Sequence, residues 1–543
     1  MPYVPPPLPE SDPTAPTPSA LAPLKLPVFR MLWFTWLAAN ISMWMNDVAA
    51  AWLMTSLTTS PVLVALVQTA ATLPMFLLGL PSGALADILD RKRFFMLTQL
   101  WVAVVALVLC AVVLAGWMTP LLLLAMIFAN GIGLAMRWPV FAAIVPELVP
   151  RQQLVAALAL NGVSMNSSRI IGPLVAGAII ASLGSAYVFM LNAVLAITAA
   201  VVISHWDRTS TVDPLGRERL LSAMRVGVQF VAQSRHLQGV MVRICLFFLH
   251  STALLALLPL VARSLPAGDA GTFTALLACM GAGAIVTALN VQQLRRYWSR
   301  DGLVLRGMAA HSVAMLVVAL APNVWVAMVA MAIGGGSWMA TANTLSVSAQ
   351  LGLPDWVRAR GMSMYQMAIM GATAIGAAVW GQVASHTTIT LSLVIAAFTG
   401  TLGMLLANRW MPDRDTVQDL TPSGVFKVPV LDQPPGEGRV VLTIEYRIDP
   451  QRAAAFRALM RVSRRSRLRY GALSWELLRD VNDPGLYTEQ IVDESWTEHL
   501  RRFDRVTRHD AALRDRKNAF HIGAEPPVVK RRIVESVDRA DTG

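Results

Sequence analysis

Apolar runs of membrane-spanning length dominate this chain. About a dozen of them occur between Val28 and Arg409, and each is close to the ~20 residues that a helix needs to cross ~30 Å of hydrocarbon. The sequence therefore predicts an all-α membrane bundle of twelve helices, with spans at roughly 31–57, 61–84, 95–116, 119–136, 161–182, 185–204, 240–262, 271–291, 302–320, 323–345, 361–384 and 388–408.

The spans form an internal repeat. Gly79 and Gly172 recur 204 positions later as Gly283 and Gly376 (283 − 79 and 376 − 172). Two homologous six-span bundles in one chain are typical of secondary transporters, which hold their substrate between the halves near the bilayer midplane. The sequence thus predicts two pseudo-symmetric six-helix bundles.

Changes in composition divide the chain into six parts. The N-terminal arm is Pro-rich and lacks the basic start, short apolar core and cleavage site of a signal peptide. In the central loop, apolar residues at helical spacing predict an amphipathic helix on the membrane surface. The expected parts are a disordered arm (1–27), an N-terminal bundle (28–204), a central loop (205–239), a C-terminal bundle (240–409), a linker (410–438) and an α+β domain (439–536).

The last part has a mixed pattern. VVLTIEYRI (440–448) alternates as a strand does, and the segments after it give the order helix, strand, strand, helix, strand. This order predicts a small ferredoxin-like fold, in which helices cover one face of a four-stranded sheet. We expect alternate apolar residues of strands such as 441–444 on the other face, and therefore a homodimer through residues 439–536.

The charges follow a membrane topology. Charged residues make up 14% of the sequence, whereas soluble proteins carry roughly a quarter. Basic residues cluster in loops on one side, including Arg137 and Arg151 after the fourth span, and the opposite side carries only Arg263. The positive-inside rule therefore predicts a multi-pass membrane protein with both termini in the cytoplasm. The membrane that we expect is a bacterial-type inner (plasma) membrane.

Several other classes of function are not expected. The net charge of +12 is explained by those loops, and no nucleic-acid-binding motif is present. Cys110, Cys245 and Cys279 fall inside apolar spans, which is typical of buried structural cysteines, and no metal-ligand cluster accompanies them. No phosphate-binding Gly-x-x-x-x-Gly-Lys-(Ser/Thr) run occurs. We therefore expect no cofactor, no metal, no nucleic-acid partner and no ATP-driven transport.

The strongest local motif is GALADILDRKR, at positions 83–93. It resembles the loop between spans 2 and 3 of the major facilitator superfamily, Gly-x-x-x-Asp-(Arg/Lys)-x-Gly-Arg-(Arg/Lys). The matching residues are Gly83, Asp87, Arg91 and Lys92. Ile88 and Asp90 depart from the pattern. Because Asp87 sits at a helix end, it can pair with Arg91 or with an opposing helix N-terminus, and the pair would form a cytoplasmic latch between the halves. An ordinary basic turn is the alternative.

A second motif lies in the fifth span. Gly172-Pro173 with Gly177 resembles the span-5 motif of antiporters in that superfamily, although Ala176 stands where the fuller motif often has a second glycine. Glycines permit close packing on a neighbouring helix and the proline sets a bend. Generic packing of small residues is the alternative.

The stretch PELVPRQQLVAALALNGVSMNSSRIIGPLVAG resembles one branch of the superfamily, the transmembrane secretion effectors, which include enterobactin-type siderophore exporters. The resemblance covers most of residues 28–409. It implies export, a direction that composition and periodicity do not show.

The segment 439–536 resembles the dimeric ferredoxin-like domain of antibiotic-biosynthesis monooxygenases. Enzymes of this kind use Trp, His and Asn side chains, and Trp475, Asn482, His499 and His509 are present. No local motif assigns these residues a role, so we expect assembly or regulation rather than catalysis.

Polar residues deep in the spans mark the expected site. Asp47 and Asn46 lie in the first span, Arg169 lies in the fifth, and His250 occupies the repeat position of Asn46 (250 − 46 = 204). Ionisable groups at this depth are costly and usually face a cavity, so these four residues are the candidate proton and substrate site. A structural ion pair of Asp47 and a buried, backbone-bonded His250 are the alternatives.

Together these features predict a proton-coupled exporter of a small organic, siderophore- or drug-like molecule that works by alternating access. An importer of the same fold is one alternative. A transporter fused to a monooxygenase-like enzyme domain is the other.

Overall fold

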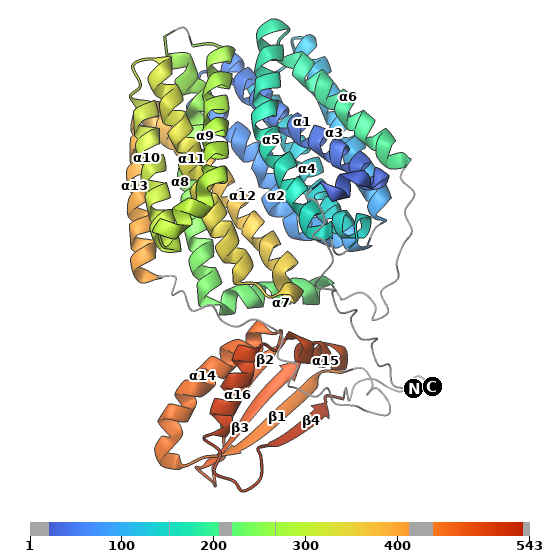
Figure 1. Ribbon diagram of the computed structural model, residues 1–543, viewed down its shortest axis with the longest axis vertical. Coiled ribbons are helices and arrows are strands. Elements are labelled where there is room, and N and C mark those ends of the chain that lie inside the picture. The colour runs from blue at the N-terminus through green and yellow to red at the C-terminus, as the bar shows by residue number, and fades with distance from the viewer. Residues whose placement is uncertain are drawn as a thin grey trace.

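The computed structural model describes residues 21–88, 90–150, 153–205, 220–266, 268–411 and 438–535. Long helices form one body, and a four-stranded sheet with its own helices forms a smaller one (Figure 1). Helix α7 (Leu220–Gln233) lies between them, across one end of the long helices. We call this end of the helical bundle proximal and the opposite end distal.

The first half of the bundle is built from long helices joined by short turns. Its helices are α1 (Pro27–Leu57), α2 (Pro61–Ile88), α3 (Arg91–Leu114), α4 (Pro120–Leu148), α5 (Leu154–Ser182) and α6 (Ser185–Ser204), and the single turn η1 (Ala22–Lys25) precedes them. Proline opens α1, α2 and α4, where its missing N–H costs no hydrogen bond. Asp90 and Thr119 cap α3 and α4 by accepting a backbone N–H.

The second half repeats this arrangement. Its helices are α8 (Arg235–Ser264), α9 (Ala270–Tyr297), α10 (Arg300–Ala319), α11 (Val324–Leu351), α12 (Asp355–His386) and α13 (Ile389–Trp410). Side-chain caps start α8 to α11 and α13, namely Ser234, Asp269, Ser299, Asn323 and Thr388. Such caps satisfy N–H groups that the first turn of a helix leaves unpaired.

Eleven of the described helices are long and apolar enough to cross a membrane. Helix α1 is not among them because polar side chains such as Asn40, Asn46 and Asp47 lower its hydropathy. Its 31 residues nevertheless pack along α5 and α6, so it occupies the place of the first span.

Two boundaries differ from the sequence-based expectation. Helix α8 begins at Arg235, so residues 235–239, expected in the central loop, are helical after the Ser234 cap. Arg137, expected in a loop, lies inside α4. The helix continues past this charge because Arg137 is buried against Trp36 of α1, with its guanidinium carbon 5.3 Å from the ring centroid.

Apolar packing joins the two halves toward the distal end. One cluster of buried residues takes members from α1 to α6 and from α8 to α13, and it contains the distal ends of α1 and α8. Toward the proximal end the described core divides. One cluster belongs to α1, α3, α4, α5 and α6, and another belongs to α8, α10, α11, α12 and α13. Among the described residues, the buried core is therefore shared by the halves distally and divided proximally.

The smaller body has the expected order of elements. Its strands are β1 (Val440–Arg447), β2 (Ser474–Arg479), β3 (Leu486–Asp493) and β4 (Val528–Ile533), and its helices are α14 (Ala453–Arg469), α15 (Trp496–Arg505) and α16 (Arg508–Asn518), with the turn η3 (Pro450–Arg452). The strands are antiparallel in the order β2-β3-β1-β4. One helix was expected between β3 and β4, but the structure has two, because the helix is interrupted at Val506. Thr507 and Asp510 then form a capping box that starts α16.

The two faces of this sheet differ from the expectation. Leu442, Ile444 and Tyr446 pack on Phe456 of α14, so they belong to the helix-covered face. By alternation, Val441, Thr443 and Glu445 point to the open face. That face is mixed rather than apolar, and Lys530 Nζ lies 2.8 Å from Glu445 Oε1 on it.

The smaller body docks on α7 and on the start of α12. Phe230 of α7, Trp356 of α12 and Tyr470, which follows α14, form an aromatic cluster with ring centroids 5.6 to 6.5 Å apart. Arg225 Nη2 donates to Glu494 Oε2 at 2.6 Å beside it. Gly471 turns the chain at φ 100°, and a Cβ there would lie 2.9 Å from Val226. The C-terminal domain is therefore attached to the second half of the bundle.

Candidate functional site between the two bundles

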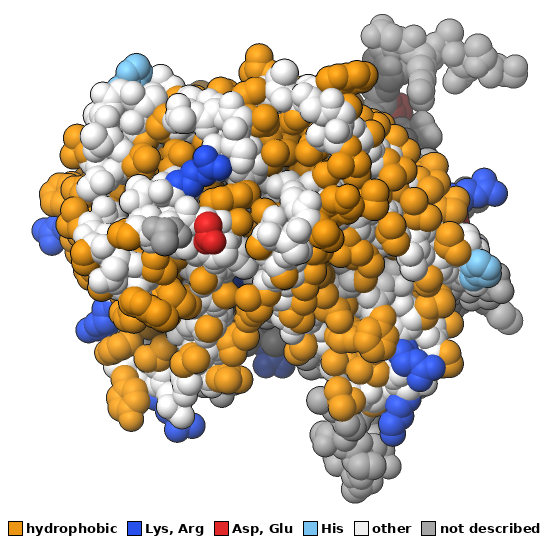
Figure 2. All heavy atoms as spheres, turned by 90° about the horizontal axis from the view of Figure 1, so that it is seen from above, with side chains coloured by type: hydrophobic (Ala, Val, Ile, Leu, Met, Phe, Trp, Pro, Cys, Tyr) orange, Lys and Arg blue, Asp and Glu red, His pale blue; other side chains and the backbone are white. Residues whose placement is uncertain are grey.

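The distal end of the junction is sealed by aromatic and polar contacts. Trp52 of α1 stacks on Phe273 of α9, with ring centroids 5.9 Å apart. Arg263 of α8 lies over Trp52 at 4.9 Å and donates to Ser56 Oγ at 3.1 Å. Figure 2 looks onto this end and shows mostly apolar side chains with few charges. The outer distal face of the bundle therefore presents few charged side chains.

Small residues let the halves approach closely along α2 and α12. A Cβ on Gly381 would lie 2.5 Å from Ala65, and one on Gly371 would lie 2.7 Å from Phe76. Thr69 Oγ1 donates to the carbonyl oxygen of Ala374 at 2.8 Å. These pairs extend the contact from the distal end toward the middle of the spans.

The glycines of the span-5 motif face different neighbours. Gly172 packs on α1 within the first half, where a Cβ would lie 3.0 Å from the carbonyl oxygen of Ile41. Gly177 packs across the junction, and a Cβ there would overlap the side chain of Thr274 in α9. Pro173 is buried between them. One motif thus serves both the internal packing of a half and the contact between halves.

Arg169 lies at the middle of the junction. Its guanidinium carbon is 5.1 Å from the ring centroid of Trp44 in α1 and 4.1 Å from that of Trp338 in α11. Trp338 belongs to the second half, so Arg169 bridges the two bundles. Its side chain is half-buried.

Asp47 lies on the same side of α1. It follows Trp44 by three residues, which places both on one helix face. The residue is half-buried, and it forms no hydrogen bond or ion pair with any residue that the structure describes. A partly accessible carboxylate at mid-span is the arrangement expected beside a hydrated space.

Asn46 and His250 lie elsewhere. Asn46 Oδ1 accepts from Asn192 Nδ2 at 3.3 Å, so it faces α6 inside the first half. The ring of His250 is bonded through Nδ1 to the carbonyl oxygen of Leu246 at 2.7 Å and packs 5.6 Å from Trp380, inside the second half. The four predicted residues are therefore not gathered in one contact in this conformation.

The latch motif spans the end of α2 and the start of α3. Gly83 and Asp87 belong to the last turns of α2, and Arg91 and Lys92 open α3. The side chains of Asp87 and Arg91 lie outside the described residues. Asp90, which departs from the family pattern, has a clear structural role, because its Oδ1 accepts the backbone N–H of Arg93 at 2.9 Å.

Arg137 was missed as a mid-span residue. It is 2% exposed, its Nη1 lies 3.5 Å from the carbonyl oxygen of Ala39, and its Nε and Nη2 have no hydrogen-bond partner in the described part of the chain. The apolar run in the sequence continues on both sides of this residue, and this continuity is the signal that could have placed it inside a helix.

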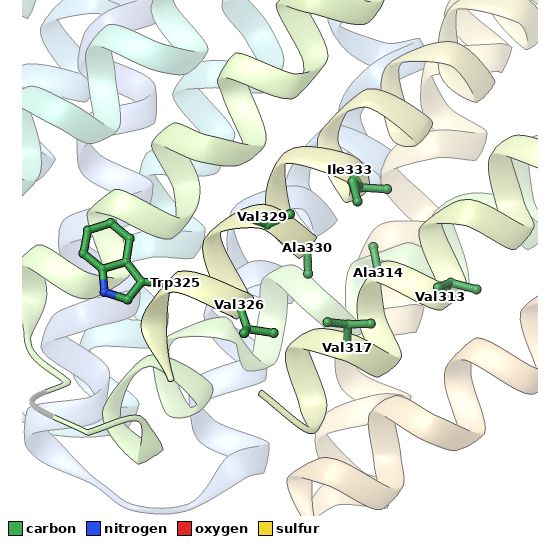
Figure 3. Close-up of a pocket in the computed structure, with 8 residues that line it drawn as sticks. All are labelled: Val313, Ala314, Val317, Trp325, Val326, Val329, Ala330 and Ile333. Atoms are coloured by element: carbon green, nitrogen blue, oxygen red, sulfur yellow. The ribbon is translucent and has the colours of Figure 1, made fainter. Parts of the chain in front are cut away.

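A groove on the outside of the second half is separate from this junction. It lies between α10 and α11, encloses about 360 Å³, and is lined by Val313, Ala314, Val317, Trp325, Val326, Val329, Ala330 and Ile333 (Figure 3). Val313 and Val329 are each more than half exposed. The lining is aliphatic apart from one indole, so this surface matches lipid hydrocarbon.

A profile of the transmembrane secretion effector family matches residues 18–540. This chain belongs to that family. It is therefore a membrane transporter of the major facilitator type, as the motifs at 83–93 and in the fifth span predicted, and the main body of the chain is not an enzyme.

Parts of this chain are similar to transporters of known name. The staphyloferrin A transporter of Staphylococcus aureus (strain NCTC 8325 / PS 47) is 22% identical over 51% of this chain and 72% of its own length. Macrolide efflux protein A of Streptococcus pyogenes is 22% identical over 54% of this chain and 73% of its own length. An uncharacterized MFS-type transporter of Bacillus subtilis (strain 168) is 28% identical, but the match spans 32% of this chain and only 41% of that relative.

Solved transporter structures share the fold of this family member. A POT family transporter in complex with 5-aminolevulinic acid superposes with a TM-score of 0.58 at 12% identity, over 71% of this chain and 96% of that one. A D-xylose-proton symporter superposes with a TM-score of 0.57 at 15% identity, over 71% of this chain and 98% of that one. The prediction of a two-bundle major facilitator fold is confirmed.

Two of the candidate enzyme residues of the C-terminal domain bond to neighbouring buried carboxylates. Trp475 Nε1 donates to Glu489 Oε1 at 2.9 Å, and His499 Nδ1 is bonded to Asp493 Oδ2 at 2.7 Å. Both carboxylates lie on the buried side of β3 and interact with Arg467. Asn482 lies in the exposed turn after β2. The side chain of His509 lies outside the described residues.

Proposed function

We propose that this transporter is a proton-coupled exporter of a small organic molecule and that it works by alternating access. The observation that carries the proposal is the divided core, which is continuous across the halves distally and separate proximally. An alternating-access protein rocks its two bundles about a central site, and this packing corresponds to one end state of such a cycle. With both termini in the cytoplasm, the proximal end faces the cytoplasm.

Asp47 is the proposed proton carrier. It is partly accessible at mid-span, it has no bonded partner among the described residues, and it neighbours the Arg169 contact between the halves. A carboxylate in such a place can be neutral in one state and ionised in the other. Asn46 and His250 remain secondary candidates for the cavity, since both already bond within their own halves.

Export of a siderophore- or drug-like cargo is proposed from the relatives. One similar protein is named a staphyloferrin A transporter and another a macrolide efflux protein. The proposed latch of Gly83, Asp87, Arg91 and Lys92 would close the proximal side in the opposite state of the cycle. An importer is the alternative. The direction in which oriented vesicles transport the cargo, uptake or efflux, distinguishes the two functions.

The test of proton coupling uses Asp47→Asn in the full chain, reconstituted in liposomes with a radiolabelled macrolide and an imposed pH gradient. The wild type should concentrate the macrolide and carry protons, whereas the variant should do neither, because the amide cannot ionise. Unchanged thermal unfolding shows that the variant is intact. A variant that still concentrates the probe rules out Asp47 as the carrier.

For the C-terminal domain we propose a regulatory or assembly role. It docks on α7 and on the start of α12 through an aromatic cluster and an ion pair. A fused enzyme is the alternative, and oxygen consumption by the protein supplied with cargo would support it. Homodimerisation through residues 439–536 stays a prediction, which sedimentation equilibrium of the full chain with and without this segment tests.

A further inference from the structure

Arg169 is a mid-span cation whose hydrogen-bonding groups have no partner among the described residues. It lies 15 residues from the start of α5 and 13 from its end, near the middle of the spans. It forms no hydrogen bond or ion pair with any described residue, although it is half-buried. A guanidinium carries five N–H donors and no acceptor, and donors at this depth need acceptors.

The surroundings of Arg169 supply further donors. The indoles of Trp44 and Trp338 interact with the cation through their rings and accept none of its N–H groups. The indole nitrogen of Trp44 is itself buried without a hydrogen-bond partner in the described part of the chain. An indole N–H is also only a donor. Within the described residues, this contact therefore holds unpaired donors and lacks a bonded acceptor.

Few charged side chains lie at mid-span. The Asp, Glu, Lys and Arg residues that lie ten or more positions from both ends of a spanning helix are Asp47, Arg137 and Arg169. Arg137 is buried inside the first half against Trp36, so Arg169 and Asp47 are the charged members of this set near the junction, and they form no ion pair in this conformation. A guanidinium without a bound carboxylate in low dielectric favours an anionic ligand.

We propose that Arg169 binds a carboxylate group of the cargo and that Trp44 and Trp338 contact its flat, apolar part. A carboxylate matches the planar fork of a guanidinium and accepts two N–H bonds at once. Trp338 belongs to the second half, so a bound carboxylate would touch both bundles and would be released when they separate. The inference rests on the proposed transport function and assigns organic carboxylates as one class of its cargo.

The test measures binding of 1-naphthoate to the full chain in lipid nanodiscs, by calorimetry and without a pH gradient. Its neutral isostere, 1-naphthamide, is the matched ligand. Arg169→Gln should weaken naphthoate binding about ten- to a hundredfold, the loss expected for hydrogen bonds to a charged group, and should leave naphthamide unchanged. Arg169→Lys should keep part of the affinity, because an ammonium retains the charge without the fork.

Arg263→Gln is the matched control, because Arg263 also lies over a tryptophan between the halves but at the distal end. It should bind naphthoate as the wild type does. Equal binding of the acid and the amide, unchanged binding in both Arg169 variants, or no binding of naphthoate to the wild type would each overturn the proposal. These outcomes leave proton coupling untouched, since that is measured with a macrolide under a gradient. Thermal unfolding shows whether Arg169→Gln folds. If it does not, Arg169→Lys takes its place in the binding test.

Discussion

Glu489 and Arg169 are both charged side chains inside the protein, and they differ in their partners. Glu489 accepts hydrogen bonds from Lys517, Ser463 and Trp475 at 2.8 to 3.0 Å. Arg169 has no such bond with a described residue. A buried ion with a full set of partners is a structural element, whereas one without partners marks a place for a ligand or a proton.

We expect Glu489→Gln to destabilise the C-terminal domain by about 3–5 kcal/mol, because it leaves the ammonium of Lys517 buried without its counter-ion. Hydrogen exchange of β3 in the full chain measures this loss. Glu445→Gln is the control. Its pair with Lys530 is about a third to a half exposed, so its removal should cost less than ~1 kcal/mol. Equal protection of β3 in wild type and Glu489→Gln contradicts the prediction.

The same carboxyl group makes stability depend on pH. Burial alone would raise the pKa of Glu489, but Lys517 and Arg467 hold the pKa well below its usual range. The stabilisation is therefore fully present above the unfolded pKa of ~4.3 and declines as the pH falls below it, where the unfolded chain takes up the proton. Protection of β3 should fall with pH between about 5 and 3, and Glu489→Gln should flatten this dependence.

At the scale of single elements, α5 combines two kinds of packing. Its start and middle pack on α1, and its distal part packs on α9 of the other half. The sequence indicated close packing at Gly172 and Gly177 from their residue type. It did not indicate which neighbour each glycine meets, because that depends on how the two halves are closed.

Gly177→Val should hinder distal closure, because its side chain would overlap Thr274 of α9. We expect a folded protein with slower transport and faster hydrogen exchange in the distal turn 264–270. Gly172→Val is the comparison. Its side chain would strike Ile41 and Trp44 within the first half, so it should lower the thermal unfolding temperature instead. Equal effects of the two variants on exchange at 264–270 would contradict this division of roles.

For the whole molecule, the main question is how the C-terminal domain is coupled to the transporter. The domain contacts α7 and the first turns of α12 through Phe230, Trp356, Tyr470 and the Arg225–Glu494 pair. Helix α12 also packs along α2 of the other half. Movement between the halves therefore acts on a helix that carries the docked domain.

Arg225→Glu and Glu494→Arg should each loosen this docking, and the double variant should restore it, because the charges then attract again. Both side chains are about a third exposed, so each single change should cost no more than ~1 kcal/mol. Hydrogen exchange of 226–231 in the full chain is the readout. Phe230→Ala, which removes a buried ring, should cost about 3–5 kcal/mol. No recovery in the double variant would show that the ion pair does not hold the domain.

The sequence by itself determined the spans, their repeat, the family and the order of strands and helices in the C-terminal domain. These features depend on composition and periodicity within short segments, so they can be predicted from the residues of each segment alone. It also marked Asp47 and Arg169, since charge inside an apolar run is visible without a fold.

Only the tertiary structure decided which of these residues meet. It put Arg169 against Trp338, put His250 inside the second half, and placed Leu442 and Ile444 on the covered face of the sheet. It also attached the C-terminal domain to α7. The physical reason is that such contacts join segments more than a hundred residues apart, or depend on which face of an element is covered. These contacts are determined by how the two halves close on each other and by how the strands pair. Neither can be predicted from the spacing of residues within one segment.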